Sequence, residues 1–270
     1  MIGRIVYRQP VHVGGCLRPP AGHPKASFAR FVTAEFPAIP DSYDLTAAAA
    51  DPLAQMWGND AVGDCMPVAI FRGSAVKLCA AGTYSRPYAT DDVIAFYSGN
   101  TGYVKGDPST DQGSDPVSAL RYAAKNGLLP DGSHKIEGFF TLDGADPQEV
   151  RRAIWLFEGV IATAELPDAF VSPPPSASGF TFDVCGDPDP ENGHGFFLPP
   201  KYRPGAVAMS TWGMVGEMTD AAVKKYCDGT AGALYVALTR DMLEKAKTKA
   251  PNGLWWGGLE ACFRAMGGAA

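Results

Sequence analysis

Residues 57–65 read Trp57-Gly58-Asn59-Asp60-Ala61-Val62-Gly63-Asp64-Cys65, a polar loop that carries a cysteine into an apolar segment. Apolar side chains at helical spacing predict a helix over residues 65–81. A thiol in the first turn of that helix would meet unpaired backbone N–H groups and the positive end of the helix dipole. Both favour the thiolate, which is the nucleophilic form. Cys65 is therefore a candidate nucleophile, and its own N–H and the Asn59 amide are candidate donors to an oxyanion.

A thiolate nucleophile needs a partner that exchanges its proton, and His194 is our candidate among the four histidines. It lies between Gly193 and Gly195 at the start of a predicted strand, where glycines allow another group to approach closely. Ser210, in the next predicted strand, is the candidate to orient the imidazole. Trp212 beside it would shield that hydrogen bond from water and so strengthen it.

The order of predicted elements is helices first and strands second. Asp-Pro entries, glycine stops and apolar periodicity predict helices over residues 65–81, 91–98, 115–127, 146–157 and 219–227. Short apolar runs bounded by Gly and Pro predict strands over residues 159–165, 193–198, 205–212 and 232–238, with a turn over 199–205. This segregation predicts an α+β fold with two lobes.

Composition excludes several classes of protein. The chain has 270 residues with 46% hydrophobic residues, enough to bury a core without disulfides or metals. The net charge of −6 and the lack of a basic cluster predict no nucleic-acid partner. No apolar stretch is long enough to span a membrane, and the first residues do not form a secretory signal, so we expect a cytoplasmic location. The six cysteines form no Cys-x-x-Cys, so we expect no metal and no cofactor.

The chain resembles the papain-like cysteine peptidases in five short motifs that occur in the family's order over about residues 36–240. These are Ile39-Pro40-Asp41-Ser42-Tyr43-Asp44-Leu45 for the opening Leu-Pro-x-Ser-x-Asp, Asn59 to Cys65 for Gln-Gly-x-x-Gly-Ser-Cys, Gln112-Gly113-Ser114-Asp115-Pro116 for the Gly-rich stretch, Gly193-His194-Gly195 for His-Ala, and Ser210-Thr211-Trp212-Gly213 for Asn-Ser-Trp-Gly. His194 also follows Cys65 at the family's separation of roughly 130 residues.

The resemblance implies an α+β, two-lobe papain-like fold, with an N-terminal helical lobe at about residues 50–157 and a C-terminal antiparallel β lobe at about 158–240. We expect residues 1–35 to be an extended arm and residues 241–270 to be a tail with a possible short helix. The catalytic residues that the resemblance implies are Cys65, His194, Ser210 and Asn59. The substrate-binding residues that it implies are Gly63, Asp64, Gly113, Ser114, Gly193 and Trp212. Asp64 has a second interpretation, which we prefer, as the N-cap of the helix.

The departures from the family pattern leave two functions open. Ser210 replaces an Asn and reaches less far, Asn59 replaces a Gln, and Val62 replaces a disulfide cysteine. The first function is a thiol hydrolase, a cysteine peptidase that cleaves peptide or isopeptide bonds. The alternative is a catalytically weak or inactive module that serves as a structural or binding subunit of a larger assembly, for example a phage particle, joined through the N-terminal arm or the C-terminal tail. In that case its location would be the virion.

Overall fold

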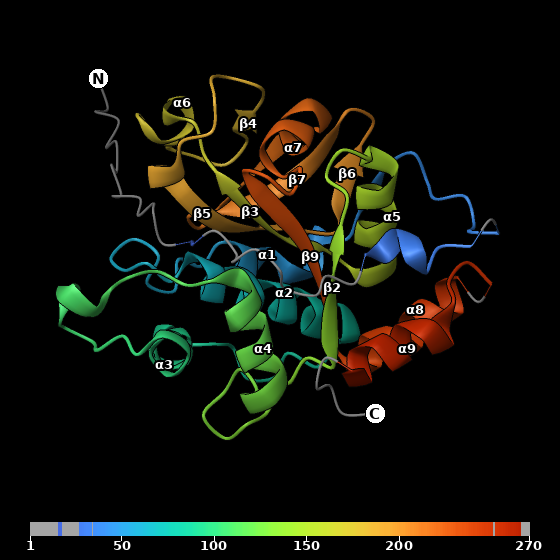
Figure 1. The fold of residues 1–270 in the computed structure, drawn as a ribbon, viewed down its shortest axis with the longest axis horizontal. Coiled ribbons are helices and arrows are strands. Elements are labelled where there is room, and N and C mark those ends of the chain that lie inside the picture. Colours follow the sequence, from blue (N-terminus) through green and yellow to red (C-terminus); the bar gives the residue numbers. More distant parts are fainter. Residues whose placement is uncertain (1–15, 18–26, 34, 251, 266–270) are drawn as a thin grey trace.

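One sheet organises the molecule (Figure 1). The computed structural model describes residues 16–17, 27–33, 35–250 and 252–265. Within them the strands follow the order β1-β6-β7-β5-β3-β9-β2, with β8 beside β7 and β4 beside β8. All neighbours are antiparallel except β4 and β8. The strands are β1 (Tyr43–Asp44), β2 (Gly138–Leu142), β3 (Val160–Glu165), β4 (Thr181–Phe182), β5 (Gly193–Leu198), β6 (Lys201–Arg203), β7 (Ala206–Thr211), β8 (Met214–Thr219) and β9 (Gly232–Leu238).

Helices cover both faces of this sheet. The α-helices are α1 (Ala50–Leu53), α2 (Cys65–Ala81), α3 (Thr90–Thr101), α4 (Pro116–Asn126), α5 (Pro147–Phe157), α6 (Asp168–Val171), α7 (Asp220–Tyr226), α8 (Arg240–Lys249) and α9 (Trp256–Ala265). The predicted bounds of α2 are confirmed, and α4 has the predicted Asp115 cap, whose carboxylate accepts from the Ser118 N–H at 2.7 Å. The predicted α+β class is confirmed.

The first lobe is formed by α2, α3 and α4 against one face of the sheet. Helix α2 is buried from Cys65 to Lys77, because the sheet lies on one side of it and the other helices lie on the opposite side. It packs mainly on β5 and β3. This contact is what brings the predicted nucleophile to the strand that carries the predicted histidine.

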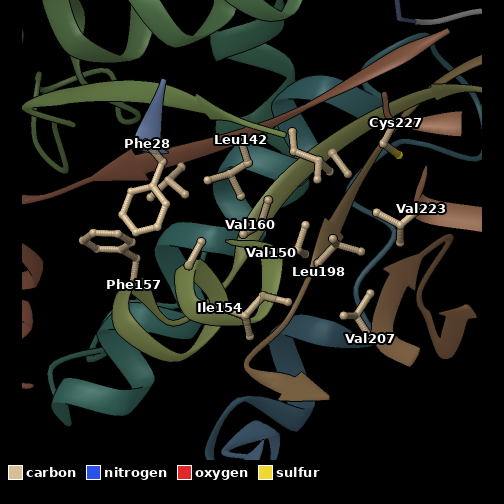
Figure 2. Close-up of a cluster of buried hydrophobic side chains, with 14 of the residues drawn as sticks. Phe28, Leu142, Val150, Ile154, Phe157, Val160, Leu198, Val207, Val223 and Cys227 are labelled. Atoms are coloured by element: carbon tan, nitrogen blue, oxygen red, sulfur yellow. The ribbon is translucent and has the colours of Figure 1, made fainter. Parts of the chain in front are cut away.

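The second lobe packs on the opposite face, around α5 and α7 (Figure 2). Strand β9 belongs to both cores because successive side chains point to opposite faces. Its residues Ala233, Tyr235 and Ala237 join the helical core, and the three residues that alternate with them join the second core. Burial on both faces explains why β3 and β9 are almost continuously apolar in sequence.

Four parts of the chain differ from the organisation that the sequence predicts. Residues 138–157 belong to the second lobe, since β2 pairs with β9 and α5 packs in the second core, so the first lobe ends near residue 137. The segment 241–270 contains two helices in place of a possible short one. In the predicted arm, Phe28 and Phe31 are buried in the core, while residues 1–15, 18–26 and 34 lie outside the described residues. The predicted turn over 199–205 contains β6.

Glu158 joins the C-terminal helices to the second lobe. Its side chain is 1% exposed and forms ion pairs with Lys245 and, at 3.7 Å, with Lys249, both on α8. Lys249 also donates to the carbonyl of Trp155 at 2.9 Å. A carboxylate buried this deeply is stable only when cations compensate it, so α8 is part of the folded unit. In the described part of the chain, no helix is both long and apolar enough to cross a membrane.

Candidate active site

Cys65 lies where the tip of α2 meets β5. Its Sγ accepts a hydrogen bond from the backbone N–H of Gly195 at 3.2 Å. A Cβ on Gly195 would lie 3.0 Å from both N and Cα of Met66, so the helix tip approaches this strand as closely as it does because residue 195 is glycine. The group that approaches β5 at Gly195 is the backbone of the helix tip.

The thiol of Cys65 is held in its protonated form. Cys65 is 1% exposed, and burial raises the pKa of its thiol to about 12. Hydrogen bonds from the N–H groups of Gly195 and Met66 lower this pKa but do not offset the effect of burial. An increase of this size opposes ionisation by about 4 kcal/mol, whereas a helix N-terminus contributes about 2 kcal/mol at most. The thiolate that the helix position predicts is therefore absent from this closed form, because desolvation outweighs the helix dipole.

Thr211, the residue after Ser210, fixes the imidazole of His194. Its Oγ1 is hydrogen-bonded to Nε2 of His194 at 2.6 Å. The Trp212 ring stacks on the imidazole with 4.6 Å between centroids, and both residues are buried. The indole of Trp212 therefore covers one face of the His194 imidazole, the position expected of a group that shields the histidine from water.

The predicted role of Ser210 is wrong. Its Oγ donates to the carbonyl of Leu53 at 3.2 Å, on the far side of β7 from Thr211, because neighbouring residues of a strand face opposite ways. The carbonyl of Ser210 accepts from Nη1 of Arg72 at 3.3 Å, and Nη2 of Arg72 donates to the carbonyl of Gln55 at 2.5 Å. Arg72 thus supports the strand end beneath the site, and burial lowers its pKa to about 10.

Asn59, the predicted oxyanion donor, is buried beside Asp64. Its side chain is 2% exposed, and its Nδ2 makes no hydrogen bond within the described residues. The Asn59 side chain lowers the pKa of the Asp64 carboxyl. The loop approaches Asp64 closely at Gly58, whose φ is +105° and whose Cβ would lie 2.8 Å from Oδ2 of Asp64.

Asp64 is at the predicted N-cap position of α2, but its side chain does not cap the helix. It is fully buried, so it cannot contact a substrate in this form. Burial and then the charge of Asp111 raise its pKa well above the usual range, while the side chain of Asn59 acts in the opposite direction. The carboxyl is therefore driven toward its neutral form beside the nucleophile.

Asp111 and Tyr97 join the loop before the nucleophile to the loop of the predicted substrate subsite. Both carboxylate oxygens of Asp111 accept from the N–H of Gly63, at 3.1 and 3.0 Å. The Tyr97 hydroxyl donates to Asp111 at 2.6 Å and accepts from the N–H of Gly113 at 2.9 Å. Gly63 and Gly113 therefore have structural hydrogen bonds that hold the cleft wall in place. Sequence reasoning missed Asp111 and Tyr97, because neither belongs to a motif.

Cys16 and Leu17, which we call the strap, bridge the two lobes. The N–H of Cys16 donates to the carbonyl of Gly193 at 3.3 Å, and the N–H of Leu17 donates to the carbonyl of Ser114 at 3.1 Å. Gly193 is on β5, and Ser114 lies two residues before α4, so the strap touches both lobes. Two of the predicted substrate-binding residues thus line opposite walls, and in this form their carbonyls are occupied by the chain itself.

Comparison with solved structures identifies the architecture. Xylellain, a cysteine protease from Xylella fastidiosa, superposes with a TM-score of 0.59 at 12% identity, over 87% of this chain and 99% of that one. The digestive procathepsin L2 proteinase of Tenebrio molitor larval midgut gives 0.58 at 14% identity, over 84% and 78%. The ragweed pollen allergen Amb a 11, a cysteine protease in its proform, gives 0.59 at 16% identity, over 82% and 72%.

The chain has the papain-like fold. No family model matches the sequence, and no curated protein matches it either. The identities are low enough that these comparisons establish the fold alone, so the chemistry of the papain-like site has to be argued from its residues. In the described residues, no group of three or more His, Cys, Asp or Glu side chains is arranged to hold a metal ion.

Proposed function

We propose that the chain is a cysteine peptidase that cleaves peptide or isopeptide bonds. The observation that carries the proposal is the hydrogen bond between Cys65 Sγ and the N–H of Gly195, which sets the sulfur against the residue next to His194. The imidazole is in turn oriented by Thr211 at 2.6 Å. A nucleophile, a base and a group that orients the base are the elements of a catalytic triad.

The reaction follows from these groups. Cys65 gives its proton to His194, and the sulfur attacks the carbonyl carbon of the scissile bond. The N–H of Cys65 and the unpaired amide of Asn59 stabilise the oxyanion. His194 then protonates the leaving amine, and water, deprotonated by the same imidazole, hydrolyses the thioester. The Thr211 hydroxyl keeps the ring oriented throughout.

An extended peptide is the ligand that the cleft walls fit. The carbonyls of Ser114 and Gly193 accept N–H groups from consecutive strap residues, one on each side of the cleft. A substrate peptide that displaced the strap would find the same two acceptors, and main-chain hydrogen bonds of this kind bind peptides without regard to side chain. The substrate is therefore expected to be extended through the cleft.

The test is peptide cleavage by the full chain, read by mass spectrometry of an unfolded protein substrate. We expect new termini with the wild type, none with Cys65→Ala, and wild-type cleavage with Cys79→Ala, which removes a thiol from the other end of α2. Cleavage that survives Cys65→Ala would refute the proposal. So would the absence of cleavage in Leu17→Pro, which lacks one hydrogen bond of the strap.

The alternative, a papain-like module with a binding or structural role, is favoured by one observation. Cys65 is 1% exposed, and burial raises its pKa to about 12, which is the property of an inert thiol. The two functions differ in what happens when the strap is released. A peptidase should gain a reactive Cys65 in Leu17→Pro, and a structural module should keep a thiol that titrates in the free-thiol range or above.

A further inference from the structure

Cys16 and Cys65 lie on the same side of one strand. The carbonyl of Cys16 packs so closely on Gly193 that a Cβ there would collide with it, and the backbone at Cys65 and Met66 packs in the same way on Gly195. Residues 193 and 195 of an extended strand present the same face and are roughly 7 Å apart. The strap and the tip of α2 are therefore neighbours along the glycine face of β5.

Hydrogen bonds to β5 hold each of the two cysteines in place along this strand. Cys16 is held at 3.3 Å through its N–H to Gly193, and Cys65 at 3.2 Å through its Sγ to Gly195. The negative charge that Cys65 would carry as a thiolate is also one of the causes that raise the pKa of Cys16, after burial. In this structure both thiols are reduced.

We propose that Cys16 and Cys65 are a redox-modification site, at which a hydroperoxide joins the two sulfurs in a disulfide that holds the strap over the nucleophile. Disulfides need Cα atoms about 4.4–6.8 Å apart, and the spacing of roughly 7 Å between residues 193 and 195, on which the two cysteines pack, is close to that range. The strap is the element that can shift, because Leu17 is 47% exposed and its only hydrogen bonds in the described residues are to Ser114 and Cys16.

The oxidation balances with one molecule of hydrogen peroxide. Cys16, which is more exposed than Cys65, attacks the peroxide as its thiolate, and because burial raises the pKa of Cys16 this step becomes faster as the pH rises. The O–O bond breaks, the released hydroxide takes up a proton as one water, and a sulfenic acid forms on Cys16. The sulfur of Cys65 then attacks the sulfenic sulfur, the S–O bond breaks, and the Cys65 proton leaves with the hydroxyl as a second water. Two thiols and one peroxide thus give one disulfide and two waters, and a dithiol reverses the change.

The disulfide would control the proposed peptidase, and that consequence rests on the proposed function. Its formation does not, because it needs only the two thiols and their placement. A protein whose two cysteines join on oxidation, but which cleaves nothing even after reduction, would overturn the proposed function and leave the modification site intact. A peptidase whose two cysteines never join would do the reverse.

The experiment treats the folded full chain with hydrogen peroxide, blocks free thiols with N-ethylmaleimide, and maps unreduced peptides by mass spectrometry. We expect a peptide that joins Cys16 to Cys65, lost in Cys16→Ser and retained in Cys262→Ser. Leu17→Pro and Leu17→Ala are a matched pair, since both remove the leucine side chain and only proline removes the N–H that donates to Ser114. The yield should fall several-fold in Leu17→Pro and stay at the wild-type level in Leu17→Ala.

Two results would overturn the inference. One is folded, oxidised wild type in which Cys65 is unlinked or joined to another cysteine. The other is an equal yield of the joined peptide in Leu17→Pro and Leu17→Ala, which would mean that the strap does not align the sulfurs. Circular dichroism of each variant before oxidation establishes that it is folded.

Discussion

At the scale of single residues, the site depends on hydroxyls and amides whose partners differ from those that motif position predicts. Cys65 and Asn59 were predicted from a polar loop entering an apolar helix, and both are buried at the start of α2, with the Cys65 sulfur bonded to the N–H of Gly195. Ser210 was predicted from its place in a motif, and this failed. The side of β7 on which a hydroxyl lies is set by strand register, and a one-residue difference reverses the face.

Thr211 should therefore matter to the proposed reaction and Ser210 should not. Thr211→Val keeps the shape of the side chain and leaves Nε2 of His194 without the bond seen at 2.6 Å. We expect kcat to fall by roughly 10- to 100-fold, because the imidazole loses its orientation. Ser210→Ala should stay within a few-fold of wild type. Equal losses in the two variants, measured as kcat and KM on one peptide, would contradict the assignment.

We predict that the carboxylate of Asp64 lowers the free energy of unfolding at neutral pH. Its pKa is raised in the folded state, so the folded chain binds more protons than the unfolded chain, and stability falls as pH rises from the ordinary Asp range through the raised folded pKa. Asp64→Asn removes this term and should raise the free energy of unfolding at pH 7 by about 1–3 kcal/mol. The gain should disappear near pH 3.5.

The control for this prediction is Asp60→Asn, an exposed carboxylate of the same loop. It should change the free energy of unfolding by less than about 0.5 kcal/mol. Urea unfolding at both pH values measures the two variants. If Asp64→Asn were less stable than wild type at pH 7, the carboxylate would be a stabilising ion and the cause given for its raised pKa would be wrong.

At the scale of elements, the decisive contact is the tip of α2 on β5. Helix α2 was predicted at its observed bounds, since a long apolar run with a glycine stop leaves little choice. The strands β2 and β8 were missed because what makes them strands is pairing with distant residues. For β2 that partner is β9, and six further strands lie between them in the chain.

Gly195→Ala tests the contact between these elements. The added Cβ would lie 3.0 Å from the Met66 backbone, and backbone cannot move aside as a flexible side chain can. We expect a loss of about 1–3 kcal/mol in the free energy of unfolding, as for other overpacked cores. Gly257→Ala on α9 is the matched control, because its Cβ would meet nothing closer than 3.9 Å. A similar stability for both variants would mean that the close approach is not required.

At the scale of the whole molecule, the order of five weak motifs was sufficient to predict the two-lobe fold, which the solved structures confirm. It could not place the boundary between the lobes. Residues 138–157 follow the helical segment in sequence but pack with β9 and α8, elements that come near the end of the chain. The order of the motifs also could not predict the strap, because the strap contacts Ser114 and Gly193 through backbone hydrogen bonds, which no side-chain pattern encodes.

We expect the C-terminal helix α8 to be essential to the stability of the whole fold. Glu158→Ala would leave two lysines of α8 without their buried partner, and we expect the free energy of unfolding to fall by about 3 kcal/mol. Glu244→Ala removes a surface ion pair with Lys247 and should cost less than about 1 kcal/mol. Urea unfolding compares the two, and equal effects would show that α8 is only loosely attached.

The account's central claim is that the sulfur of Cys65 is activated by His194 once the strap is displaced. The most direct measurement is the rate at which a peptide vinyl sulfone alkylates Cys65 in Leu17→Pro, with and without His194→Ala, read by peptide mapping. We predict rapid modification of Cys65 in Leu17→Pro and a loss of at least 100-fold when His194→Ala is added, since general-base catalysis contributes about 10²–10⁴. Modification at the same rate in both variants, or in neither, would contradict it.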